Sequence, residues 1–253
     1  MKHISTASIS SLTREMTVAS RLKVVAITGG DQGIGRGIVE CYAQEGADLA
    51  LCYRSNTKGT DEVVAETQKM GRKTAALQAD VGKVADGQRF ITDAVAQLGR
   101  VDILVNNAGL ERRADSWDVT EQDYDLFLDV DLKSPFFVTQ AFVKHRMQAK
   151  AGGKVINISS VHEELPFPHS TSCGASKGGI KMMTRNLSIG LAPLGITTNS
   201  IAPGAIETPI NKNLLNDPAE LKPLLESIPL TAWESRKTWP ASPRFLRPQS
   251  RTI

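Results

Sequence analysis

Short apolar runs alternate with segments of helical periodicity along most of the chain. Residues 24–27 are uninterruptedly apolar, which is typical of a parallel strand buried on both faces. Ile34, Ile38 and Cys41 then recur at helical spacing, and Gly46 ends that helix. The alternation occurs six times and predicts an α/β fold: a single doubly wound, Rossmann-type, mostly parallel sheet with helices on both faces. The other predicted strands cover residues 49–53, 74–78, 103–105, 154–158 and 196–200, and the other predicted helices cover residues 58–70, 83–98, 120–148 and 172–191.

Both ends of the chain lack this alternation. Residues 1–21 are rich in Ser and Thr, so we expect an extension outside the domain. Three interpretations are open for it: a disordered extension, a true start at Met16, or a weak organelle-targeting segment. The domain is expected over residues 22–230. Residues 231–253 form a basic, Pro-rich tail without an apolar period, so the sheet is expected to lack its C-terminal strand.

Composition and charge narrow the classes of function. The 253 residues are 41% apolar and 23% charged, which suits one large domain with a continuous core. No stretch approaches the roughly 18–20 apolar residues of a membrane-spanning helix, so no membrane partner is expected. Three cysteines without metal-ligand spacing favour a reducing, cytoplasmic location and no metal site. The positive charge lies at the ends, whereas residues 24–230 carry a net charge of −4, which disfavours nucleic acid as a partner.

A glycine-rich turn joins the first predicted strand to the first predicted helix. Residues 28–35 read Thr-Gly-Gly-Asp-Gln-Gly-Ile-Gly. Glycines here allow a tight turn and the close approach of a diphosphate, and the helix N-terminus supplies free N–H groups with partial positive charge. A purely structural turn is the alternative, but its position in the alternating pattern favours dinucleotide binding. The predicted binding residues of the turn are Gly29, Asp31, Gly33, Ile34 and Gly35.

The spacing of these glycines, together with later motifs, resembles the short-chain dehydrogenase/reductase family over residues 22–230. Residues 106–109 read Asn-Asn-Ala-Gly, which matches the family motif after the fourth strand letter for letter. The resemblance implies NADP or NAD as cofactor and an alcohol as the small-molecule substrate. The further cofactor-binding residues that it implies are Asp80 and Val81 near the adenine, Asn106, Ala108 and Gly109 after the fourth strand, Lys177 on the last long helix, and Pro203, Gly204, Ile206 and Thr208 near the nicotinamide.

Three segments are similar, more narrowly, to the glucose 1-dehydrogenase branch of the family. They are residues 106–111, 159–163 and 203–210. This resemblance implies hydride transfer between a sugar or polyol hydroxyl, most of all that of glucose, and the nicotinamide. It also implies a homo-tetramer, although the atypical tail is expected to weaken that assembly.

The end of the second predicted strand bears on the choice of cofactor. An acidic residue there would accept hydrogen bonds from the adenosine ribose and repel a 2′-phosphate. Instead, Arg54 could pair with a phosphate and Ser55 could donate to it. An exposed arginine without this role is the alternative. We therefore expect NADP to be accepted, and NAD as well.

The catalytic positions implied by the resemblance are Ser160, Lys177, Cys173 and Asp131. In the family, a tyrosinate takes the hydroxyl proton, and Cys173 stands where that tyrosine is expected. A cysteine lacks the ring, so we expect it to stop short of the substrate oxygen. Asp131 replaces the family's asparagine and cannot donate while ionised. Impaired activity is therefore expected, and a catalytically inactive dinucleotide-binding protein is the alternative. A further group suits either the substrate side or a solvated loop: His162, Glu163, Glu164 and His169.

The tail has two interpretations. Its codons, read in a shifted frame, can encode Gly-Lys-Pro-Glu-Asp-Val-Ala, and family members carry such a segment after the Ile-Pro-Leu found here at residues 228–230. A frameshift from about residue 231 is the first interpretation, and a genuine divergent tail is the second.

Overall fold

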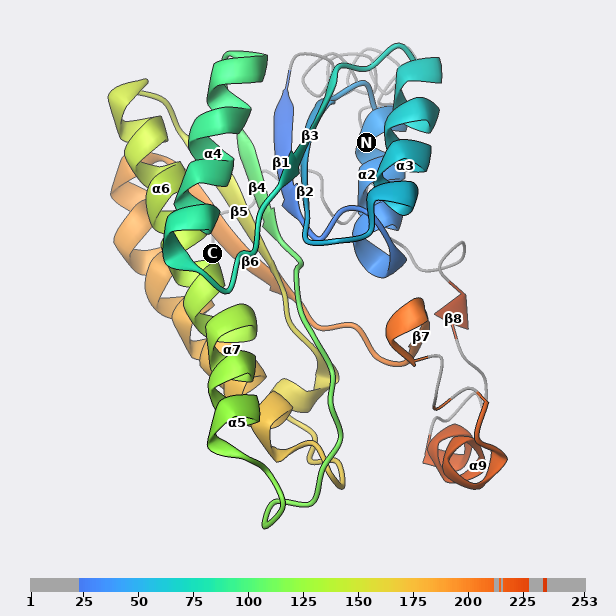
Figure 1. The fold of residues 1–253 in the computed structure, drawn as a ribbon. Coiled ribbons are helices and arrows are strands. Elements are labelled where there is room, and N and C mark those ends of the chain that lie inside the picture. The colour runs from blue at the N-terminus through green and yellow to red at the C-terminus, as the bar shows by residue number, and fades with distance from the viewer. Residues whose placement is uncertain (1–22, 212–213, 215, 228–233, 236–253) are drawn as a thin grey trace, which may run out of the picture.

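A six-stranded parallel sheet forms the centre of the computed structural model, which describes residues 23–211, 214, 216–227 and 234–235 (Figure 1). Its strand order is β3-β2-β1-β4-β5-β6, and each neighbouring pair is parallel. The predicted doubly wound fold is therefore confirmed, with strand ends within one residue of the expected ones. The strands are β1 Val24–Thr28, β2 Asp48–Tyr53, β3 Thr74–Gln78, β4 Ile103–Asn106, β5 Gly153–Ile158 and β6 Ile196–Ile201.

Helices cover both faces of this sheet because alternate side chains of each strand point to opposite faces. Val25 and Ile27 of β1 pack with Ile38 in one buried cluster, beneath α2 and α3. Val24 and Ala26 belong to the other cluster, beneath α4, α6 and α7 (Figure 1). The helices are α2 Gly33–Gln44, α3 Thr57–Lys69, α4 Val84–Leu98, α5 Glu121–Leu128, α6 Ser134–Gln148, α7 Thr171–Leu191 and α9 Pro218–Ser227.

The uninterrupted helix predicted over residues 120–148 is wrong in one respect. A π-helical turn, η1 (Asp129–Lys133), separates α5 from α6. Pro135 follows in the first turn of α6, and proline has no N–H for the regular i→i−4 bond. Just before this proline, the N–H of Ser134 donates to the carbonyl of Asp129, five residues back and not four, which defines the π-helical turn. This wider turn carries Asp131, so the interruption lies at a candidate catalytic position.

The two ends of the chain are described only in part. The predicted extension over residues 1–21 lies outside the described residues, and so does most of the tail. Of the tail, Glu234–Ser235 forms β8, which pairs in parallel with β7 (Ile206–Glu207) in a separate small sheet. Among the described residues, no strand pairs with the free edge of β6. Most of the tail lies outside those residues, so the absence of a C-terminal strand stays a prediction. Within the same residues, no helix combines the length and apolar character needed to cross a membrane.

Candidate functional site

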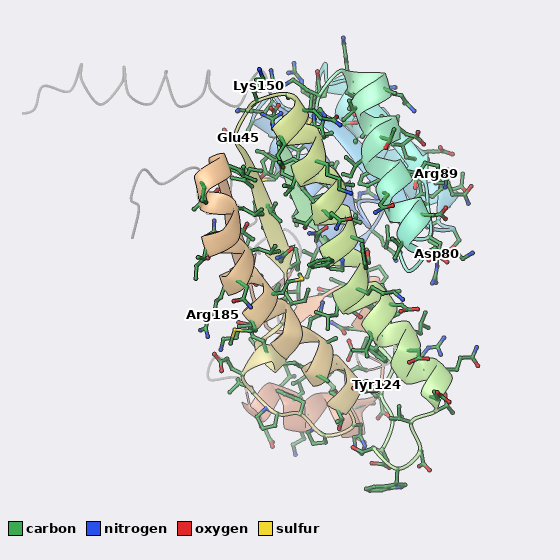
Figure 2. All side chains as sticks on the ribbon, turned by 90° about the vertical axis from the view of Figure 1, so that its left-hand side faces the viewer. Glu45, Asp80, Arg89, Tyr124, Lys150 and Arg185 are labelled. Carbon is green, nitrogen blue, oxygen red and sulfur yellow. The ribbon has the colours of Figure 1, made fainter. Side chains whose placement is uncertain are left out.

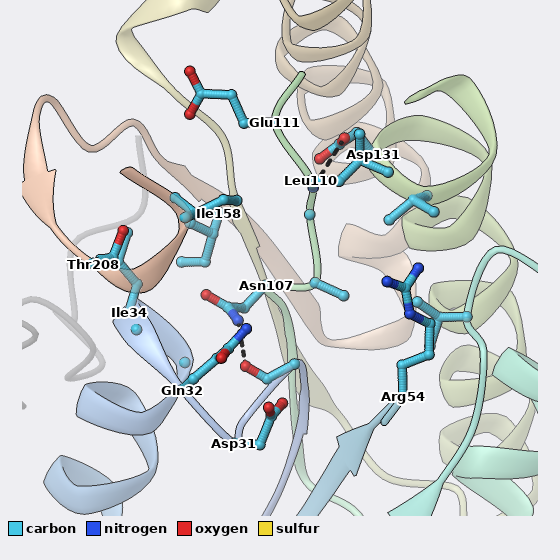
Figure 3. A pocket seen from close by; sticks show the side chains of 18 of the residues that line it. Asp31, Gln32, Ile34, Arg54, Asn107, Leu110, Glu111, Asp131, Ile158 and Thr208 are labelled. Atoms are coloured by element: carbon cyan, nitrogen blue, oxygen red, sulfur yellow. Dashed lines mark hydrogen bonds between the residues drawn. The ribbon is translucent and has the colours of Figure 1, made fainter. Parts of the chain in front are cut away.

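A pocket of about 350 Å³ opens at the carboxyl ends of the parallel strands (Figure 3). It lies where the strand order reverses between β1 and β4, which is where open α/β sheets bind ligands. The turns after β1 to β5 and the first turns of α7 contribute to its wall. The structure thereby brings most of the predicted residues together. The predicted residues that line it are Gly29, Asp31, Gly33, Ile34, Gly35, Arg54, Ser55, Asp80, Val81, Ala108, Gly109, Asp131, Ser160, Cys173, Lys177 and Thr208.

Four predicted cofactor residues do not line this pocket: Asn106, Pro203, Gly204 and Ile206. Asn106 is the last residue of β4 and points into the core, where its amide nitrogen donates to Thr139 Oγ1 at 3.0 Å and Asn157 Oδ1 at 2.8 Å. It therefore joins β4 to α6 and β5. The carbonyl of Pro203 accepts from the N–H of Val161, so this segment supports the loop after β5.

The neighbouring Asn107 holds two walls of the pocket together. Its amide nitrogen donates to the carbonyls of Thr28 and Gly29, both at 2.9 Å. In return, Thr28 Oγ1 accepts from the backbone N–H groups of Asn107 and Ala108. The turns after β1 and β4 are thus connected by four hydrogen bonds across about eighty residues of chain. Sequence reasoning missed this role, although Asn107 stands inside the motif it identified.

The glycine-rich turn forms a cradle of backbone groups at the N-terminus of α2. Gly29 and Gly33 have φ values of +65° and +54°, a region that favours glycine. A Cβ at Gly35 would lie 1.9 Å from the carbonyl oxygen of Gly29, so no side chain fits there. Gln32 precedes the helix without a side-chain cap, which leaves the first-turn N–H groups available. An anion such as a diphosphate fits this cradle.

An ion pair is buried at the other end of the pocket. Lys177 Nζ lies 3.0 Å from Asp131 Oδ1, and the two residues are 9% and 2% exposed. The ammonium also donates to the carbonyl of Ile158 at 3.3 Å. Burial raises the pKa of Asp131, while Lys177 and the N–H of Leu110 act in the opposite direction. The lysine charge is therefore matched by a carboxylate inside the protein.

Cys173 and Ser160 both line the pocket. Burial raises the pKa of the Cys173 thiol to about 11, and the nearby Lys177 only partly opposes this. At neutral pH the group is therefore a thiol and not a thiolate. Ser160 Oγ accepts from the N–H of His162 at 3.2 Å, and its hydroxyl proton has no acceptor among the described residues.

The two interpretations of the polar loop after β5 apply to different residues. His162 lines the pocket, and its ring stacks on Phe167 with centroids 4.8 Å apart. Burial lowers the pKa of His162, which favours the neutral imidazole. His169 lies 2.7 Å from Asp115 at the surface, and Glu164 pairs with a lysine of α7. In the part of the chain that the structure describes, no three His, Cys, Asp or Glu side chains form a metal site.

Comparison with known proteins agrees with this arrangement. The model of the short chain dehydrogenase family matches residues 23–219. The 3beta-hydroxysteroid dehydrogenase 1 of Eggerthella lenta is 37% identical over 196 residues, covering 78% of this chain and 75% of that protein. Glucose 1-dehydrogenase 2 of Bacillus subtilis is 34% identical over 212 residues, covering 83% and 82%.

A solved structure shows the same fold. The short chain dehydrogenase from Burkholderia cenocepacia in complex with NADP superposes with a TM-score of 0.84 at 28% identity, covering 92% of this chain and 94% of that one. Fold, cradle and motif positions therefore agree with the match to the family model. The chain belongs to the short-chain dehydrogenase/reductase family of oxidoreductases.

Proposed function

We propose that this chain binds NADP or NAD and acts on a sugar or polyol hydroxyl, most of all that of glucose, with low turnover. One observation carries the proposal: the anion cradle of α2 and the Ser160–Lys177 region line one continuous pocket. The similarity to the Bacillus subtilis glucose 1-dehydrogenase supports the substrate class. The NADP complex of the Burkholderia cenocepacia relative supports the cofactor.

Different residues of the pocket would bind different parts of the cofactor. The cradle at Gly29, Gly33 and Gly35 would hold the diphosphate, because its glycines leave the backbone N–H groups accessible. Arg54 and Ser55 follow β2 and line the pocket, where they would bind a 2′-phosphate. The bound nicotinamide would supply the hydride acceptor for alcohol oxidation.

The side chains of the pocket can orient the substrate, but they remove its hydroxyl proton poorly. The Ser160 hydroxyl would donate a hydrogen bond to the substrate oxygen. Lys177 remains held by Asp131 and the carbonyl of Ile158. The Cys173 thiol has a pKa of about 11, so it is protonated at neutral pH and does not take the hydroxyl proton efficiently. Slow proton removal therefore limits turnover.

A second candidate is a dinucleotide-binding protein without catalysis. Cys173 and Asp131 favour this candidate, because the Cys173 thiol is not a base at neutral pH and Asp131 forms an ion pair with Lys177. Binding and turnover must therefore be measured separately.

Two measurements test these proposals. Isothermal titration with NADP should show saturable binding, and reduction of NADP with glucose should be slow. Cys173→Tyr should raise kcat by about 10²–10⁴-fold, the usual contribution of a positioned general base. Cys173→Phe supplies the ring without the hydroxyl and should give no gain. Binding without turnover in both variants would favour the second candidate, and the lack of NADP binding by folded protein would contradict both.

Assembly and location complete the proposal. The helices α6 and α7 run along one face of the molecule (Figure 2). Exposed apolar side chains on both helices support a homo-oligomer. We propose the tetramer that the family resemblance implies. The three cysteines form no disulfide in the described part of the chain, which supports a cytoplasmic location. The apolar side chains concerned are Phe136, Met147, Met182 and Ile189.

A further inference from the structure

We infer that Asp31 determines how this chain chooses between NAD and NADP, an inference that rests on the proposed binding of a dinucleotide. Asp31 belongs to the turn between β1 and α2, and it is 7% exposed. It lines the same pocket as Arg54 and Ser55, which follow β2 (Figure 3). One negative and one positive side chain therefore line the same pocket.

Asn56 holds the carboxylate of Asp31 in place. Its amide nitrogen donates to Asp31 Oδ2 at 3.0 Å, while its amide oxygen accepts from the N–H of Gly59 at 3.1 Å and caps α3. The bond to Gly59 sets which side of the amide faces Asp31. A Cβ at Gly59 would lie 2.9 Å from the carbonyl oxygen of Asp31, so α3 packs directly against the turn. The carboxylate is therefore preorganised by two elements.

The carboxylate of Asp31 stands in for an acidic residue that the sequence lacks after β2. In dinucleotide-binding folds, an acid about twenty residues after the glycine-rich turn accepts a hydrogen bond from the ribose 2′-hydroxyl. Here the chain after β2 reads Arg54-Ser55-Asn56 and has no acid. Asp31 brings a carboxylate to Asn56 from the neighbouring turn instead.

The two charged groups act in opposite directions on the two cofactors. Asp31 Oδ1 has no donor among the described residues, so it can accept from a ribose hydroxyl. A 2′-phosphate carries only acceptors and about two negative charges, so Asp31 repels it while Arg54 attracts it. Neither cofactor is excluded, and the balance depends on Asp31.

Equilibrium binding tests this inference without any need for turnover. We would measure dissociation constants of NAD, NADP, 5′-AMP and 2′,5′-ADP by calorimetry, because the two nucleotides report on the adenosine end alone. Asp31→Asn keeps the size of the side chain and an acceptor for Asn56 but removes the charge. It should tighten NADP and 2′,5′-ADP about tenfold, or about 1.4 kcal/mol, and weaken NAD and 5′-AMP about threefold. Arg54→Gln should weaken only the 2′-phosphorylated ligands.

Asp61→Asn is the matched control, since it removes one exposed carboxylate from α3 outside the pocket. It should leave all four dissociation constants within about twofold of their original values. An unchanged NAD-to-NADP ratio in Asp31→Asn, or an equal loss for both cofactors, would overturn the inference while the proposed function stands. If the folded wild-type chain bound none of the four ligands, the proposed function itself would fail.

Discussion

Replacing Lys177 by methionine will leave Asp131 buried without its counter-ion. Methionine retains an unbranched apolar chain, so the change removes mainly the ammonium. The two charges lie 3.0 Å apart, and their side chains are 11% and 1% exposed. Removing one partner of a buried ion pair costs about 3–5 kcal/mol, because the remaining charge keeps its desolvation penalty. We expect a loss of that size in the free energy of unfolding at pH 8.

The loss should depend on pH with a defined sign. Burial already raises the pKa of Asp131 above its ordinary value of 3.8, and Lys177 opposes this shift. Without Lys177, the pKa of Asp131 in the folded state rises further. A carboxyl group with a raised folded pKa stabilises the fold when protonated, and that contribution is lost as the pH rises through the folded pKa. Asp131 has one folded-state pKa in the wild type and a higher one in Lys177→Met. As the pH rises from the first value to the second, the loss in the free energy of unfolding should grow by up to about 1.4 kcal/mol per pH unit.

Urea unfolding of the wild type and Lys177→Met between pH 5 and pH 8 measures both effects. The double variant Asp131→Asn with Lys177→Met removes both charges and should recover most of the stability, with little dependence on pH. A deficit below about 1 kcal/mol that is the same at every pH would refute the reasoning, because it would show that Asp131 is hydrated in the folded protein.

Three further substitutions test the cradle and the core, and the last of them is a control. Gly35→Ala should weaken NADP binding at least tenfold in a calorimetric titration, because its Cβ would lie 1.9 Å from the carbonyl oxygen of Gly29; unchanged affinity would contradict the cradle. Asp102→Ala should lower the free energy of unfolding by about 3–5 kcal/mol, because its buried carboxylate lies 3.1 Å from the buried Arg146. Arg89→Ala, in an exposed pair, should cost less than about 1 kcal/mol in the same urea experiment, and equal losses would contradict the role of burial.

Much of the fold could be predicted from local patterns. Apolar runs such as residues 24–27 and 103–105 predicted β1 and β4, because strands buried on both faces contain few polar residues. The glycine spacing of residues 28–35 predicted the turn, because a side chain at Gly35 has no room. The family resemblance then predicted most of the residues that line the pocket.

Other features depended on partners that are distant in the sequence. Helical periodicity continued through residues 129–133, so only the structure revealed the π-helical turn that carries Asp131. The sequence likewise placed Asn106 among the cofactor residues, whereas its amide bonds with Asn157 inside the core. Periodicity reports which face of an element is buried, but not which polar group lies opposite.

By itself, the sequence determined the order of strands and helices, the glycine cradle and the unusual residues at positions 131 and 173. The tertiary structure alone decided that Asp131 pairs with Lys177 and that Asp31 meets Asn56. The physical reason is that hydrophobic patterning acts over a few neighbouring residues. Ion pairs and hydrogen bonds require atoms within about 3 Å, and only packing brings those atoms together.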